Sequence, residues 1–287
     1  MKDGSIFPNV FIIGAPKCGT TSLADWLSQH RDFHVPIKKE LNFLNTDHKM
    51  WDAWSLDDVE EEFGSQSSKF RVDASVLYCL SDTALKKISE LPDVSLVVLC
   101  LRDPRSMYLS IHAQQYRTLY ETESSPGKAW SNHYENVRRA LRSDDADTAI
   151  NLNYKEIAAP ASIVKRVKSF ISEDKLLIVR FEDLQQRPEK VYREILRLTG
   201  CSFQEVNFSH LNSRSRIRLR WLHVLVKKLS ILKKNLGISS SFGIARFVSK
   251  AFHVPFQDKT DAELPKDAEK FFSEQSFKLR DALNGKD

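Results

Sequence analysis

The chain has 287 residues, of which 41% are hydrophobic and 10% aromatic, so it can bury a full core and global disorder is excluded. Its four cysteines form no C-x-x-C pair, which argues against a disulfide scaffold and a zinc ribbon. The net charge of +5 suits an anionic ligand but does not indicate nucleic acid as a partner. No signal peptide and no apolar run near the ~20 residues that cross a bilayer are visible, so we expect a cytoplasmic protein.

Strands and helices alternate along the predicted order of elements. Short apolar runs predict strands over residues 10–13, 70–80, 95–101 and 175–181, and two of these runs are continuous enough for strands buried on both faces. Helical spacing follows the first, third and fourth of these runs, and a further helix is predicted over 83–91. Residues 47–69 are expected at the surface as helix and loop, and residues 121–150 are expected to be loop-rich.

This order predicts an α/β fold of three layers, in which a central, mostly parallel sheet is flanked by helices as in P-loop proteins. No linker divides the chain. We therefore expect a single domain over residues 1–287, with a nucleotide-binding core over about 8–200 and a basic helical region over about 210–287.

A glycine loop lies between the first predicted strand and the following helix. It contains Gly14, Lys17, Gly19 and the hydroxyl residues Thr20, Thr21 and Ser22. The start of a helix offers unpaired N–H groups and a positive dipole end, so this composition predicts a phosphate-binding loop. The alternative, a helix start capped by Thr or Ser, explains fewer of these features.

The loop differs from that of nucleoside triphosphatases, which reads G-x-x-x-x-G-K-[ST], because Thr20 stands where the lysine is required. The stretch from Gly14 to Leu23 instead resembles the 5′-phosphosulfate loop of sulfotransferases that use 3′-phosphoadenosine 5′-phosphosulfate (PAPS). The resemblance implies that the loop binds this donor, with Lys17 also acting at the sulfuryl group. The implied cofactor-binding residues are Pro16, Lys17, Cys18, Gly19, Thr20, Thr21 and Ser22.

A second motif begins at the end of the strand predicted over 95–101. Arg102 stands at that strand end, and Ser110 follows on the next helix. Ligands bind at the carboxyl ends of parallel strands, and arginine makes bidentate contacts with phosphate. The spacing from Arg102 to Ser110 resembles the 3′-phosphate motif of the same sulfotransferases, which implies that both residues bind the 3′-phosphate of PAPS.

The segment around Glu40 supplies a candidate general base. Its residues Lys39, Glu40 and Phe43 resemble the K-E-x-x-F-F stretch of glycan sulfotransferases, including heparan-type enzymes, although Asn42 and Leu44 depart from it. The resemblance implies that Glu40 takes the proton of the acceptor hydroxyl. A solvated charge cluster is the alternative. Asp73 is a second candidate base, and weaker alternatives are His34, His48 and His112.

Residues 214–236 combine eight basic side chains with leucines at helical spacing. This pattern fits peripheral contact with a membrane or an anionic glycan, and equally a helix that packs its apolar face on the domain.

Taken together, the motifs predict a PAPS-dependent sulfotransferase that needs no metal and releases adenosine 3′,5′-bisphosphate. We expect the acceptor to be a saccharide or glycoconjugate hydroxyl, including a lipid-linked glycan, and no nucleic acid partner. Two alternatives remain open, a P-loop kinase and a polyanion-binding module without catalytic activity.

Overall fold

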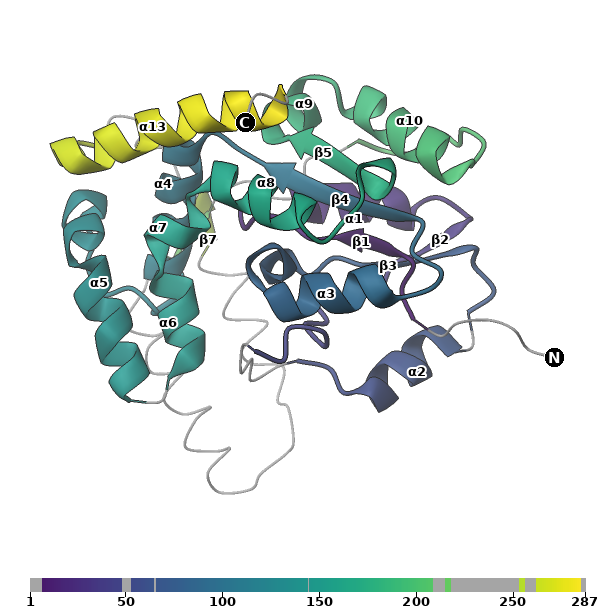
Figure 1. Cartoon of the computed structure of the whole chain (residues 1–287), viewed down its shortest axis with the longest axis horizontal. Helices are drawn as coiled ribbons and strands as arrows, with labels where there is room; N and C mark the ends of the chain where they lie inside the picture. The colour runs from purple at the N-terminus through teal and green to yellow at the C-terminus, as the bar shows by residue number, and fades with distance from the viewer. Residues whose placement is uncertain are drawn as a thin grey trace.

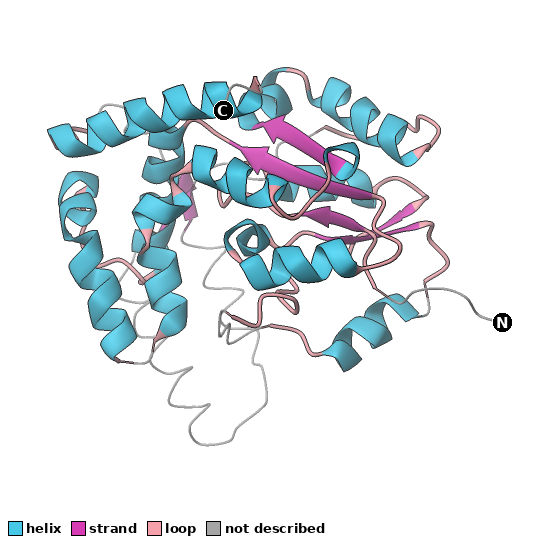
Figure 2. Ribbon diagram, viewed as in Figure 1, coloured by secondary structure: helices cyan, strands magenta, loops and turns pink. Residues whose placement is uncertain are grey.

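The protein is described from a computed structural model, which covers residues 7–47, 53–64, 66–143, 145–208, 215–217, 253–255 and 262–284. A five-stranded sheet lies at its centre, with the strand order β2-β3-β1-β4-β5. Every pair of neighbouring strands in this sheet is parallel (Figure 2). The strands are β1 (Val10–Ile12), β2 (Phe33–His34), β3 (Phe70–Asp73), β4 (Leu96–Leu101) and β5 (Leu176–Arg180).

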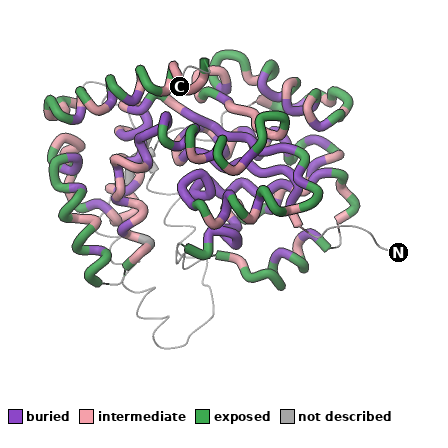
Figure 3. Tube along the Cα trace, viewed as in Figure 1, coloured by how far each residue is buried: buried purple, intermediate pink, exposed green. Residues whose placement is uncertain are grey.

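The two innermost strands explain why the sequence folds around this sheet. Every residue of β1 and of β4 is buried, as expected for parallel strands covered on both faces. The buried tube of Figure 3 follows the same strands through the middle of the molecule. The predicted parallel α/β fold is therefore confirmed.

Helices cover both faces of the sheet (Figure 1). The helix α1 packs against α10, whereas α3 and α8 lie on the opposite face, as right-handed crossovers running in opposite directions from the sheet centre require. The helices are α1 (Thr20–Ser28), α2 (Leu56–Gly64), η1 (Val76–Leu80), α3 (Asp82–Glu90), α4 (Pro104–Thr118), α5 (Pro126–Arg142), α6 (Ala146–Leu152), α7 (Tyr154–Ile157), α8 (Pro160–Lys168), η2 (Glu173–Lys175), α9 (Phe181–Gln186), α10 (Pro188–Thr199) and α13 (Lys266–Leu283).

Two sequence-based predictions of local structure were wrong. The strand expected over 70–80 ends at Asp73, and a buried 3-10 helix, η1, takes the rest of the apolar run. The region 121–150 holds α5 and part of α6 rather than loop. Pro126 and Gly127 lie in the first turn of α5, where proline is tolerated, and Ser125 caps that helix.

The C-terminal helix α13 packs on α4 and α8. Aromatic rings join α13 to α4 and α5, because Phe272 of α13 stacks on Tyr108 of α4 at 5.5 Å and is tilted against Trp130 of α5 at 4.8 Å. Arg105 adds an ion pair to Glu269 at 3.0 Å. The helix is thus held on the side of α4 by an apolar cluster and a charged contact.

The basic region over 214–236 lies outside the described residues except for β6 (Ser215–Ile217), which pairs antiparallel with β7 (His253–Pro255). The proposal of membrane or glycan contact through this region therefore stays a prediction. Within the described ranges, none of the helices combines the length and the apolar character needed to span a membrane.

Candidate active site

The candidate site lies where the chain leaves β1 and β4. The connection after β1 leads to one side of the sheet, and the path after β4 leads to the other, so the two loops flank a switch point of the topology. The pairing of β1 and β4 extends into the loop, because Ala15 N donates to the carbonyl of Cys100 at 2.6 Å. A Cβ on Gly14 would lie 2.4 Å from Leu99 Cδ1 and 3.2 Å from the carbonyl oxygen of Cys100, so a larger residue would displace the Leu99 side chain.

The glycine loop turns into α1 through two residues with left-handed backbone, Lys17 at φ 67 and Gly19 at φ 84. Gly19 is the N-cap residue of α1, and it has no side chain to cap the first N–H groups. Side chains of Ser81, Asp103 and Ser125 cap α3, α4 and α5, whereas α8, α10 and α13 also begin without a side-chain cap. The start of α1 therefore presents its N–H groups and positive dipole end to an anion rather than to a capping side chain.

The helix α9 packs against this turn at Gly19. A Cβ on Gly19 would lie 2.7 Å from Leu184 Cδ1 and 3.1 Å from Phe181 Cδ2. The Arg102 guanidinium stacks on the same Phe181 ring, 4.4 Å from its centroid. Phe181 thus supports both the turn and the arginine, a role that the sequence did not single out.

Arg102 directly follows β4 and reaches across to the glycine loop. Its Nη1 donates to the carbonyl of Lys17 at 3.4 Å, and burial lowers the pKa of the guanidinium, which still stays charged because arginine begins so high. Ser110 is buried on α4, two turns beyond the N-cap Asp103. Arg102 therefore meets the loop directly, and Ser110 lies on the helix that starts beside it.

Lys39 is a cation that the sequence analysis named only as part of the Glu40 motif and did not place at the glycine loop. Its Nζ donates to Thr20 Oγ1 at 2.9 Å and to Thr21 Oγ1 at 3.1 Å, and burial lowers its pKa. A lysine therefore reaches the start of α1 from a distant segment, although the sequence carries Thr20 where nucleoside triphosphatases carry lysine. Its position next to Glu40 was the available signal, but spacing alone could not place it at the loop.

Glu40 follows Lys39 and has a left-handed backbone, with φ 67. Its Oε1 lies 3.9 Å from Lys39 Nζ, and 40% of its side chain is exposed. The structure thus connects Glu40 to the glycine loop through Lys39 and leaves its carboxylate partly exposed.

The remaining loop residues differ in how far their side chains are buried. Cys18 is fully buried and points inward, with its Sγ donating to Met107 Sδ at 3.5 Å, and burial raises the pKa of its thiol. Cys18 can therefore offer a ligand only its backbone. Pro16, Thr21 and Ser22 are half-buried, whereas Thr20 is buried beneath Lys39.

The alternative bases have structural partners. Asp73 is 0% exposed and accepts a hydrogen bond from Ser75 Oγ at 2.6 Å. Burial raises its pKa to about 6. His34 contacts Glu62 at 2.8 Å, and His112 contacts the carbonyl of Glu123 at 2.9 Å. His48 lies outside the described residues.

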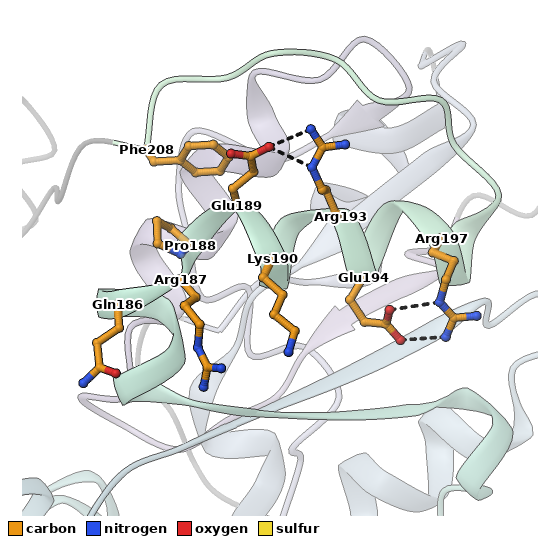
Figure 4. Close-up of a pocket in the computed structure, with 9 residues that line it drawn as sticks. All are labelled: Gln186, Arg187, Pro188, Glu189, Lys190, Arg193, Glu194, Arg197 and Phe208. Atoms are coloured by element: carbon orange, nitrogen blue, oxygen red, sulfur yellow. Dashed lines mark hydrogen bonds and ion pairs between the residues drawn. The ribbon is translucent and has the colours of Figure 1, made fainter.

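A separate hollow lies along the outer face of α10 (Figure 4). Each of its three arginines is paired with an acidic residue: Arg187 with Asp183, Arg193 with Glu189 and Arg197 with Glu194. These exposed pairs engage the arginines with neighbouring carboxylates, whereas the glycine loop brings Lys39 and Arg102 to the start of α1, so we place the candidate site at the glycine loop. In the part of the chain that the structure describes, no group of three or more His, Cys, Asp or Glu residues could hold a metal ion.

Solved structures of other proteins share this fold. The sulfotransferase from Alicyclobacillus acidocaldarius is 22% identical, with a TM-score of 0.62 over 84% of this chain and 99% of that chain, which shows a shared fold.

Two further sulfotransferase structures match with lower TM-scores. The domain from the curacin biosynthetic pathway is 13% identical, with a TM-score of 0.47 over 95% of this chain and 99% of its own. Mouse SULT7A1, solved in complex with PAP, is 12% identical, with a TM-score of 0.44 over 99% of this chain and 85% of its own. No curated protein matches the chain in sequence. The family model described as "Sulfotransferase domain" matches residues 7–250, and the protein therefore belongs to this family of sulfuryl-transferring enzymes.

Proposed function

We propose that this sulfotransferase uses PAPS as its donor and binds it across the glycine loop and the β4–α4 junction. The observation that carries the proposal is the start of α1, which has no capping side chain. Two cationic side chains lie beside it: Lys39 donates to Thr20 at the start of the helix, and Arg102 donates to the carbonyl of Lys17 in the preceding loop. Backbone N–H groups, threonine hydroxyls and cations together fit a dianionic 5′ group.

Each end of the donor has its own residues in this proposal. The loop residues Pro16 to Ser22 hold the 5′ side through backbone N–H groups and the hydroxyls of Thr20, Thr21 and Ser22. Arg102 and Ser110 hold the 3′-phosphate at the end of β4. A donor with phosphate groups at both 3′ and 5′ positions explains why the site spans two strand ends, which a 5′-triphosphate does not require.

The chemistry is assigned to Glu40 and Lys17. When bound, the donor supplies an activated sulfuryl group that moves to an acceptor oxygen as adenosine 3′,5′-bisphosphate leaves. Glu40 accepts the proton of the acceptor hydroxyl, since its carboxylate is partly exposed. Lys17 stabilises the negative charge that develops on the leaving phosphate, and no metal is needed for that step because fixed cations and helix N–H groups are in place.

We further propose a saccharide or glycoconjugate hydroxyl as the acceptor, including a lipid-linked glycan. The support is the likeness of the segment around Glu40 to glycan sulfotransferases. A cytoplasmic location also stays a prediction. The kinase alternative is weakened because Asp103, the acidic residue after β4, accepts from Ser106 N at 2.8 Å as the cap of α4, so it already has a structural role.

The test is sulfuryl transfer from PAPS to a panel of saccharide, glycolipid and simple lipid alcohols. We expect transfer to the saccharide-containing acceptors and a loss of turnover of about 100-fold or more in both Lys17→Ala and Glu40→Gln, as removal of a charge-stabilising donor or a base produces. Wild-type turnover in Glu40→Gln would remove Glu40 as the base. Transfer to lipid alcohols alone would contradict the saccharide proposal but leave the donor assignment intact.

A further inference from the structure

The backbone that carries Glu40 is held in an unfavourable conformation. Glu40 and Asn42 have φ values of 67 and 54, in the left-handed region that asparagine tolerates but that is unfavourable for glutamate. A glutamate in this conformation persists only where the surroundings fix it. The contacts of the next residues, 41–44, show what supplies that constraint.

Two backbone N–H groups of this segment donate to buried hydroxyls that lie beside the carboxyl of Asp73. Asn42 N donates to Ser75 Oγ at 3.0 Å, and Ser75 Oγ donates in turn to Asp73 Oδ1 at 2.6 Å. Leu44 N donates to the hydroxyl of Tyr78 at 3.3 Å. Tyr78 and Leu41 lower the pKa of Asp73 against the larger effect of burial, and among the described residues Asp73 Oδ2 has no hydrogen-bond partner, so the direct contact to the carboxyl is the one from Ser75.

The support behind this carboxyl is rigid. Asp73 ends β3 in register with Phe11 of β1, and η1, which carries Tyr78, is tied to β1 by a hydrogen bond from Cys79 N to the carbonyl of Ile13 at 3.1 Å. Asp73, Ser75 and Tyr78 are each 0% exposed. Hydrogen bonds in such surroundings are strong, and an unpaired member is costly.

We propose that Asp73, Ser75 and Tyr78 form a clamp that positions Glu40 for proton transfer by fixing the backbone immediately after it. The inference rests on the proposed role of Glu40 as the base. Asp73 is then a positioning residue, because it is too deeply buried to reach an acceptor, and it acts through Ser75 and Tyr78. Fixing the backbone at Glu40 also fixes the neighbouring Lys39, whose ammonium lies between the loop hydroxyls and the Glu40 carboxylate.

The experiment compares Ser75→Ala with a matched control, Ser81→Ala. Ser81 is also 0% exposed, and its hydroxyl likewise donates to a carboxylate, Asp47 at 2.6 Å, and accepts from a backbone N–H, that of Ala84 at 2.9 Å. It differs in that it caps α3 rather than holding the segment after Glu40. Both variants thus lose the same kind of hydrogen bonds.

Three readouts are taken on the full chain. The first is hydrogen exchange of the Leu41, Asn42 and Leu44 amides, and the second is kcat and the donor KM for transfer from PAPS. The third is whether the effects of Ser75→Ala and Glu40→Gln on kcat add up in the double variant. For Ser75→Ala we expect about 10-fold faster exchange at these amides and about 10-fold lower kcat with little change in donor KM, since misplacement of a base acts on the chemical step. Ser81→Ala should change neither. In a Glu40→Gln background, Ser75→Ala should lower kcat no further, because both changes act on one function.

A second pair of variants, Asp73→Asn and Asp73→Ala, distinguishes loss of the Ser75 hydrogen bond from a general failure to fold. Asp73→Asn keeps an oxygen that can accept from Ser75 and should retain more turnover than Asp73→Ala. Wild-type kcat in Ser75→Ala beside an inactive Glu40→Gln would overturn the positioning inference alone. Full turnover in Glu40→Gln would overturn the proposed base, and the inference with it. Equal losses in Ser75→Ala and Ser81→Ala would show a general effect on stability and would also overturn the inference.

Discussion

Lys17 and Glu40, the two residues to which we assign the chemistry, share a left-handed backbone with φ 67. Such conformations cluster at functional sites because the surrounding fold must maintain them. At Lys17 the neighbours are Arg102, which donates to its carbonyl, and Gly19, which completes the turn. The sequence singles out both residues by type and spacing, but it contains no sign of their backbone strain.

Among individual residues, Lys39 should contribute to the binding of adenosine 3′,5′-bisphosphate. Its ammonium contacts both threonine hydroxyls at the start of α1, so Lys39→Met should weaken binding of the bisphosphate about 10-fold, or 1.4 kcal/mol. Lys38→Met is the matched control, because the Lys38 ammonium lies 5.6 Å over the Trp54 ring. Titration calorimetry measures both variants, and equal losses in the two would indicate only an effect of net charge.

Asp73 should give the protein a measurable dependence of stability on pH. Its pKa is raised from 3.8 to about 6, so between these values the native state holds a proton that the unfolded chain has released. This contribution is complete below about pH 4 and is lost as the pH rises through 6, a change of about 3 kcal/mol. The free energy of unfolding of wild type minus that of Asp73→Asn should therefore fall from pH 4 to pH 7 in urea titrations. A difference that does not change with pH would contradict the burial of a titrating carboxyl.

At the scale of elements, the sequence identified the strands that carry the site but not all of the helices around them. The apolar runs that became β1, β4 and β5 are followed at once by the glycine loop, Arg102 and Phe181, so local pattern was sufficient there. It failed over 121–150, where Pro126-Gly127 and an acidic run look like loop. Both are helix starts in the structure, since Ser125 and Asp145 act as N-caps.

The contacts that complete the site come from segments far apart in sequence, and for that reason they could not be predicted. Lys39 reaches Thr20, Asp73 supports Asn42 through Ser75, and Phe181 underlies Arg102. Each depends on the order in which strands assemble in the sheet. Periodicity and spacing describe neighbours along the chain and carry no information about that order.

The helix α13 should stabilise the fold through its aromatic face. Phe272 is 2% exposed and packs against Tyr108 and Trp130, so Phe272→Ala should lower the free energy of unfolding by about 3–5 kcal/mol. Phe277, on the same helix, is 63% exposed, and Phe277→Ala should change it by about 0.5 kcal/mol or less. Urea denaturation distinguishes the two. Comparable small effects in both would mean that α13 contributes little to the core.

For the whole molecule, the site depends on the parallel sheet as a frame. The carboxyl ends of β1, β3 and β4 lie beside one another and carry the glycine loop, Asp73 and Arg102 in that order. Helices on both faces bury these strands (Figure 1), so small shifts of the frame are costly. A site built from three strand ends is therefore fixed by the fold, and the segment around Glu40 is attached to it by the Asp73 clamp.

In the proposed function, this frame binds a nucleotide phosphorylated at both the 3′ and 5′ positions without a metal. This binding is tested most directly by calorimetric titration of adenosine 3′,5′-bisphosphate and of ATP with magnesium into the full chain, each with wild type and Arg102→Ala. We predict that the bisphosphate binds in the presence of a chelator and that Arg102→Ala weakens it at least about 10-fold, as loss of an arginine–phosphate contact implies. Preferential binding of magnesium-ATP, or bisphosphate binding that Arg102→Ala leaves unchanged, would contradict the account.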